Sequence, residues 1–133
     1  MEKLISFDLV SPEKILFSDK VRMIIIPGKD GDIGVLPGHS KLLSSLRPGR
    51  VLVYGEDKRI IKSFYVSGGF VEINPEKSVL LAEEVFEISE LNKSDIEKQI
   101  QGLENQNTEE SKQQYLIAKS KIDAIEAKYY EKI

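Results

Sequence analysis

The chain has 133 residues, the length of one domain or of one small domain with an appendage. Hydrophobic residues make up 41% and charged residues 31%, which excludes general disorder because such a chain can bury a core. The net charge of −3 disfavours nucleic acid as the main partner, since phosphate-binding domains are usually basic. The lack of cysteine excludes disulfides, thiolate metal sites and thiol nucleophiles.

No part of the sequence is typical of a membrane or targeting segment. The longest apolar runs have the length of strands and fall far short of the ~20 residues of a transmembrane helix. Residues 1–8 contain acidic residues and alternate in hydropathy, unlike a signal or transit peptide. We therefore expect neither a transmembrane helix nor a cleaved leader.

Glycine and proline divide the chain into two parts. Of the 9 glycines and 5 prolines, all but Gly102 precede residue 76. Frequent turn residues indicate many short strands, and a long stretch without them indicates helix. The predicted fold is an N-terminal antiparallel β-sandwich over residues 1–88, followed by a C-terminal α-helical hairpin over residues 92–133.

Within the first part the hydropathy alternates with a period of two. Residues 5–9 alternate as in a strand with one buried face. Residues 51–66 read as two strands joined by a hairpin turn at residues 55–58. The pair Gly68 and Gly69 interrupts the next apolar run, which predicts a bulge or a sharp bend.

Two helix starts are predicted in the second part. Ser94 and Glu97 have the spacing of a capping box, and Asn92 is an alternative cap for the same helix. Thr108 or Asn107 can cap the second helix. Two helices joined by a short connection favour an antiparallel hairpin.

The apolar stripe of the second helix is narrow. A helix of about 23 residues would be roughly 35 Å long. Such a pair is marginally stable unless it packs against the sandwich or another protein. The stripe consists of Tyr115, Ala118, Ile122, Ile125, Tyr129 and Ile133.

The sequence shows no catalytic constellation. His39 is the only histidine and lies in a predicted loop, so a structural or surface role is favoured over catalysis. The glycine-rich residues 28–34 lack the Gly-Lys-Ser/Thr end of a P-loop. Asp30 and Asp32 resemble the start of a calcium loop, but position twelve is Lys41 instead of a bidentate glutamate. We interpret this segment as a turn between strands.

Lysines recur along the last helix among glutamates and aspartates. They predict either a solvated face or a surface that meets an acidic partner, and the sequence leaves both interpretations open. The lysines are Lys112, Lys119, Lys121, Lys128 and Lys132.

Three stretches carry a family resemblance. They are residues 31–49, with the string GVLPGH, residues 64–73, with VSGGFVE, and residues 79–84. In order and spacing they are similar to the epsilon subunit of the bacterial F-type ATP synthase, whose mitochondrial counterpart is called delta. The resemblance covers the whole predicted β part and extends to the two-helix tail.

The resemblance implies a non-catalytic rotor subunit in the central stalk. In this family the sandwich is clamped to the gamma subunit and seated on the c-ring, so that it couples c-ring rotation to the gamma shaft. By resemblance, the turn of Asp30, Gly31 and Asp32 would face the c-ring. The residues expected at the gamma interface, or supporting it, are Gly34, Pro37, Gly38, His39, Leu42 and Leu43.

The resemblance also implies a regulatory tail. The family's hairpin lies folded beside the sandwich or extends toward the alpha and beta subunits, where it blocks ATP hydrolysis. Lys112, Lys119, Lys121 and Lys128 would then meet acidic loops of those subunits. Some members bind ATP through an Asp-x-x-Arg-Ala-like motif, but this chain has no arginine after Arg59, so we expect no cofactor.

By the same resemblance, the chain is expected at the cytoplasmic face of the bacterial inner membrane, as a peripheral part of the complex. An alternative is a free-standing β-sandwich adaptor that binds a protein and dimerises through its helical tail. A third class, an enzyme or a carbohydrate-binding sandwich, is disfavoured because the chain has no tryptophan for a sugar platform.

Overall fold

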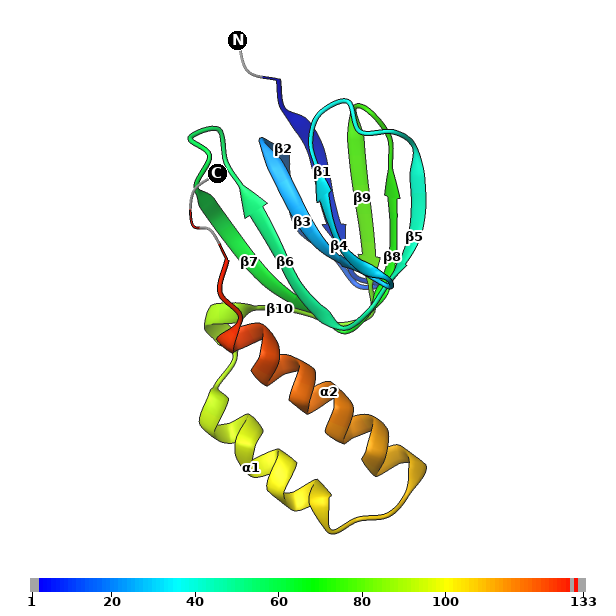
Figure 1. Cartoon of the computed structure of the whole chain (residues 1–133), viewed down its shortest axis with the longest axis vertical. Coiled ribbons are helices and arrows are strands. Elements are labelled where there is room, and N and C mark those ends of the chain that lie inside the picture. Colours follow the sequence, from blue (N-terminus) through cyan, green and yellow to red (C-terminus); the bar gives the residue numbers. More distant parts are fainter. Residues whose placement is uncertain (1–2, 130, 132–133) are drawn as a thin grey trace.

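The computed structural model describes residues 3–129 and 131. Over these residues it contains ten strands in two packed layers, followed by two α-helices (Figure 1). The strands are β1 (Ile5–Val10), β2 (Ile15–Val21), β3 (Met23–Gly28), β4 (Gly31–Val35), β5 (Leu42–Leu46), β6 (Gly49–Tyr54), β7 (Ile60–Val66), β8 (Gly69–Ile73), β9 (Lys77–Ala82) and β10 (Val85–Glu87). A 3₁₀ turn (Ile88–Glu90) leads to α1 (Lys93–Glu104) and α2 (Glu109–Glu126).

The strands form one hydrogen-bonded sheet that folds over into two layers. Its order is β10-β7-β6-β3-β5-β8-β9-β1-β2, with β4 paired to the free part of β3. The layers meet at β3 and β5, which share the pair Gly28 and Leu46. The β-sandwich and the helical hairpin are confirmed. One strand pair departs from the predicted antiparallel arrangement, because β1 lies parallel to β9 where it enters between β9 and β2.

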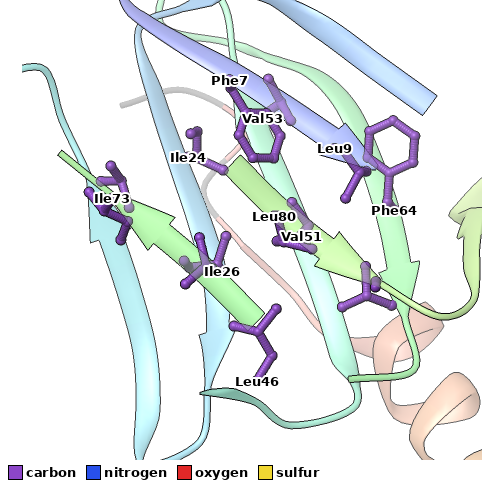
Figure 2. Close-up of a cluster of buried hydrophobic side chains, with 14 of the residues drawn as sticks. Phe7, Leu9, Ile24, Ile26, Leu46, Val51, Val53, Phe64, Ile73 and Leu80 are labelled. Atoms are coloured by element: carbon purple, nitrogen blue, oxygen red, sulfur yellow. The ribbon is translucent and has the colours of Figure 1, made fainter. Parts of the chain in front are cut away.

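The hydrophobic core lies between the two layers. Figure 2 shows side chains of both layers, such as Phe7 and Val53, pointing into this space. Residues 5–9 alternate between buried and half-buried positions, as predicted. Phe17 of β2 bridges the layers, with ring centroids 5.9 Å from Phe7 and 6.3 Å from Phe64 of β7. Burial of these side chains is the main stabilising contribution to the sandwich.

Gly68 and Gly69 carry the chain from β7 in one layer to β8 in the other. Their φ angles of +118° and +139° are ones that residues with a side chain rarely adopt. A Cβ atom on Gly69 would lie 1.9 Å from the carbonyl oxygen of Leu81. The predicted sharp bend is confirmed, and it requires glycine for both conformation and space.

The helices begin at side-chain caps. Asn92 caps α1 by accepting a hydrogen bond of 3.1 Å from the amide of Asp95. The predicted capping box at Ser94 is wrong, because α1 already begins at Lys93 and leaves Ser94 inside its first turn. In α2, Thr108 forms a reciprocal capping box with Ser111, each hydroxyl accepting from the other's amide at 3.0 Å.

α2 is shorter than predicted. It spans 18 residues and ends at Glu126, because Ala127 is extended, with φ −60° and ψ 138°. Tyr129 of the predicted stripe therefore lies beyond the helix, and Ile133 lies outside the described residues. The segment after α2 turns back along β7, where the amide of Ile60 donates a hydrogen bond of 2.9 Å to the carbonyl of Glu131.

Candidate functional site

The outer face of the layer formed by β5, β8, β9, β1 and β2 carries an exposed apolar row. Phe70 pairs with Leu81, Leu81 with Val10, and Val10 with Ile15 across four neighbouring strands. Directly paired residues project to the same face of a sheet. Phe70, Leu81 and Ile15 are 60%, 53% and 63% exposed. These four residues are therefore an apolar stripe directed at solvent.

Leu43 on β5 extends this stripe. It is 73% exposed, and it pairs with Glu72, two residues along β8 from Phe70, so it lies on the same face. A groove of about 620 Å³ runs between this face and the Gly68–Gly69 bend. We call Leu43, Phe70, Leu81, Val10 and Ile15 the apolar face. A patch of this kind on a soluble protein is typical of a docking surface.

The loop before β5 holds the predicted residues Pro37, Gly38 and His39. The amide of Gly38, at φ +86°, donates to the carbonyl of Pro75 at 2.8 Å, which ties the loop to the turn between β8 and β9. The Nδ1 atom of His39 lies 2.6 Å from the carbonyl oxygen of its neighbour Ser40. The loop thus lies next to one end of the apolar face.

The predicted residues Leu42 and Leu43 point to opposite faces of β5. Leu42 pairs with Ile73, whose side chain belongs to the core, and is 37% exposed at the strand end. Of these two residues, only Leu43 lies on the apolar face.

The predicted acidic turn lies on the other layer, between β3 and β4. Asp30, Gly31 and Asp32 are all exposed, and so is Gly34 on β4. Asp32 forms an ion pair with Arg47, which also donates to the carbonyl of Gly28. Asp30 forms no ion pair among the described residues and is therefore the freer charge of the turn. The turn does not share a face with the apolar row.

The C-terminal end of α2 and the segment after it lie against β6 and β7, while the rest of the hairpin extends away from the sandwich (Figure 1). Leu52, Tyr54 and Tyr65 are fully buried, yet they do not belong to the core between the layers. The hydroxyl of Tyr65 and the Oγ of Ser120 on α2 share a hydrogen bond of 2.8 Å. Burial raises the pKa of Tyr65, while the bond to Ser120 partly opposes this. The end of α2 and the segment after it therefore lie on the outer side of β6 and β7, and the opposite layer stays open.

The candidate lysines of the hairpin point in several directions. Lys112 and Lys119 are exposed seven residues apart, on one side of α2. Lys121 lies over the rings of Phe86 and Tyr65, with its Nζ 4.9 and 5.8 Å from their centroids. Lys128 lies beyond the helix and is exposed. In this folded position Lys121 faces the sandwich, and Lys112 and Lys119 share the solvated side.

Sequence reasoning missed three residues that organise these surfaces. Phe70 and Leu81 are neighbours in sequence of the buried Val71 and Leu80 and therefore point to the solvent side of their strands. An apolar residue at such a position was the signal that could have identified them. Arg50 had no such signal, because its partner in α2 is more than 70 residues away in the chain. Across residues 3–129 and 131, no group of three or more His, Asp or Glu side chains could hold a metal ion.

The comparisons with known proteins agree with this geometry. A family model described as the ATP synthase Delta/Epsilon chain, beta-sandwich domain, matches residues 4–88. The ATP synthase epsilon chain of Rhodospirillum centenum is 43% identical, over 77% of this chain and 73% of that protein. The epsilon chain of Maricaulis maris is 31% identical over 96% of this chain and 97% of its own length.

The chain belongs to the delta/epsilon family of ATP synthase. It is a non-catalytic subunit of the central stalk and a peripheral part of the membrane-bound complex. Among the described residues, no helix is long and apolar enough to cross a membrane. A chain of the Euglena gracilis mitochondrial ATP synthase has the same fold, with a TM-score of 0.75 and 20% identity over 92% of this chain and 78% of that one. The resemblance drawn from residues 31–49, 64–73 and 79–84 is confirmed.

Proposed function

We propose that this subunit grips the gamma shaft with its apolar face and thereby couples rotation of the c-ring to gamma. The observation that carries the proposal is the exposed apolar face of Leu43, Phe70, Leu81, Val10 and Ile15, which the chain's own hairpin leaves uncovered. The loop of Pro37, Gly38 and His39 flanks this face and supports the predicted interface.

The architecture suits the transmission of torque. The two layers share one continuous hydrogen-bonded sheet around a close-packed core, and such interiors have low compressibility. A rigid body of this kind passes on a rotation with little internal deformation. The subunit itself then breaks and forms no covalent bond, in keeping with its lack of a catalytic constellation.

The test of the grip is binding to purified gamma. Phe70→Arg places a charge at the centre of the apolar face, and we expect it to weaken binding by at least about tenfold, because an unpaired charge is costly in a desolvated interface. Ile61→Arg is the matched control, since Ile61 is 48% exposed on β7 of the other layer. Equal affinity of Phe70→Arg and the unmodified chain would contradict the proposal.

The acidic turn is proposed to meet the c-ring. Asp30→Lys is the sharper variant here, because Asp32 is already paired with Arg47. We expect the variant to assemble less well with the c-ring while it still binds gamma, measured by co-purification with each partner. Normal assembly would place the c-ring contact elsewhere.

The hairpin is proposed to act as a brake on ATP hydrolysis after it leaves the sandwich. Lys112 and Lys119 are the exposed pair on one side of α2 that would meet acidic loops of the alpha and beta subunits. Replacing both by glutamate should raise hydrolysis by the assembled enzyme while proton-driven synthesis continues. Unchanged hydrolysis would reject the brake and leave the proposed grip unaffected.

Two further expectations complete the proposal. The subunit is placed at the cytoplasmic face of the bacterial inner membrane, held there only through the complex. No bound nucleotide is proposed, because the hairpin has no arginine to hold phosphate. The adaptor alternative differs in stoichiometry, since it predicts a dimer in sedimentation where the stalk subunit alone sediments as a monomer.

A further inference from the structure

The C-terminal end of α2 lacks a cap of its own. The last carbonyl groups of a helix have no partner within the helix and carry partial negative charge. α2 has no basic residue in its last turn, and the chain leaves it in an extended conformation at Ala127. Partners for these carbonyls must therefore come from outside the helix.

Arg50 on β6 supplies them. Its Nη1 donates to the carbonyls of Ala124 and Ala127, both at 3.1 Å. Its Nε donates to the Oγ of Ser63 on β7 at 2.6 Å, which fixes the guanidinium against the sheet. One sandwich residue thus provides both the hydrogen bonds and the positive charge that the end of α2 requires.

The ring of Tyr129 covers this arrangement. The guanidinium carbon of Arg50 lies 5.4 Å from the ring centroid, within the range of a cation–π interaction. Burial lowers the pKa of Arg50, but an arginine keeps its charge at all physiological pH values. The partial exclusion of water strengthens the bonds to the carbonyl groups.

The rest of the contact between hairpin and sandwich is less selective. Leu52, Tyr54 and Tyr65 are buried on the outer face of the sheet, and burial of apolar surface is non-directional. The carbonyls of Ala124 and Ala127 reach Arg50 only when the end of α2 lies directly over β6. Arg50 therefore defines the position in which the hairpin docks.

We propose that Arg50 is a latch that holds the hairpin folded against the sandwich. When the hairpin leaves, the helix end loses its cap and the guanidinium returns to water, so release breaks these contacts together. The latch stands independently of the proposed grip on gamma, because it concerns only contacts within this chain.

The amide of Ile60 reports on this latch. It donates to the carbonyl of Glu131 in the segment that follows α2, so its hydrogen exchange follows the opening of that segment even when the open state is rare. In Arg50→Met, which keeps the length of the side chain, we expect this amide to exchange about tenfold faster than in the unmodified chain, since charged hydrogen bonds are lost. The core amide of Val53 should keep its exchange rate.

Matched variants separate the latch from a general loss of stability. Arg47→Met makes the same chemical change in a residue that donates to Gly28 and Asp32 of the sandwich, and it should leave Ile60 exchange unchanged. Arg50→Lys keeps the charge but loses the planar guanidinium. Its Ile60 exchange rate should lie between those of the unmodified chain and Arg50→Met. Equal acceleration in Arg47→Met, acceleration of Val53 in Arg50→Met, or an unchanged Ile60 would overturn the proposal.

A second measurement follows the hairpin itself. The chain has no cysteine, so spin labels can be attached at Glu56→Cys in the sandwich and Gln113→Cys in α2, both exposed positions. We expect one narrow distance distribution in the unmodified background and a broader one with Arg50→Met. A distribution that stays narrow while Ile60 exchanges faster would limit Arg50 to the tail after α2, and would overturn the latch.

Discussion

Single residues in this protein are fixed most tightly where the chain passes between the two layers. Gly69 lies at that crossing with φ +139° and in close contact with the backbone of Leu81. A side chain there would have to displace the hydrogen-bonded strand β9, and displacing it would disturb the apolar face as well as the core. The crossing is therefore a structural requirement for the surface that we propose as the grip.

Gly69→Ala should destabilise the fold by roughly 3 kcal/mol or more, because backbone strain and a clash with a carbonyl group add together. Gly34→Ala is the matched control, since a Cβ atom there meets nothing within 4 Å. Urea unfolding of both variants measures the difference. Similar midpoints for the two would show that β8 and β9 can separate at little cost.

The sequence identified glycine at this bend, but it did not identify the role of Phe70 next to it. A bend is a local property, and the two adjacent glycines, Gly68 and Gly69, are enough to predict it. The exposure of Phe70 depends on which strands lie on either side and on the absence of a covering element. The role of Arg50 depends likewise on a helix end far along the chain. Local patterns predicted the elements, and contacts between distant elements determined the surfaces.

At the scale of elements, α2 depends on caps at both ends. Its N-terminus is capped within the hairpin by Thr108 and Ser111, while its C-terminus is capped by Arg50 of the sandwich. The sequence predicted the first cap at Thr108 or Asn107, because both residue types favour the N-cap position, but it did not predict the capping box with Ser111. It could not predict the second, and for this reason the predicted helix ran on toward residue 133 instead of ending at Glu126.

Thr108→Ala should cost about 1 kcal/mol in the stability of α2, because the amide of Ser111 loses its partner. Amide exchange in the first turn of α2 should become faster by roughly fivefold, which follows from the same free energy. Asn107→Ala is the control, since Asn107 precedes the cap and should change this exchange little. Faster exchange in Asn107→Ala but not in Thr108→Ala would contradict the prediction, because it would mean that Asn107 caps α2 in solution.

Docking of the hairpin should weaken at alkaline pH. Burial raises the pKa of Tyr54, Tyr65 and Tyr129, although the charge of Arg50 partly opposes this at Tyr54 and Tyr129. A raised pKa means that the folded state favours the neutral phenol. The stabilising contribution is therefore complete below the unfolded pKa of about 10 and is lost as pH rises through the raised values.

Thermal unfolding between about pH 9 and pH 11.5 measures this loss. The unmodified chain should lose stability steadily above about pH 10, and Tyr65→Phe should show a shallower decline because one of the titrating groups is gone. A decline of the same steepness in both proteins would contradict a contribution from Tyr65.

At the scale of the whole molecule, the two outer faces of the sandwich differ in what lies on them. The end of α2 and the segment after it lie on the face of β6 and β7, and the apolar face of the opposite layer stays open. The order of the two parts along the chain was predictable from glycine and proline, but the side on which the hairpin docks was not. That side follows from Leu52, Tyr54, Tyr65 and Arg50, which the alternation of β6 and β7 directs away from the core.

Deleting residues 92–133 should therefore expose a second apolar face. We expect the shortened chain to bind a hydrophobic dye more strongly and to self-associate at concentrations where the full chain stays monomeric. Replacing Leu52 and Tyr65 by threonine in the shortened chain should reduce both effects. A monomeric shortened chain with unchanged dye binding would mean that the hairpin does not cover this face in solution.

The most direct measurement of the central claim is proton-driven ATP synthesis in vesicles that contain the ATP synthase without its epsilon subunit. Adding the unmodified chain, or Ile61→Arg, should restore coupled synthesis, whereas Phe70→Arg should restore less than about a tenth of it at equal concentration because its grip on gamma is lost. The chain alone should hydrolyse no ATP. Full restoration by Phe70→Arg, or turnover by the isolated chain, would contradict a non-catalytic rotor subunit that acts through its apolar face.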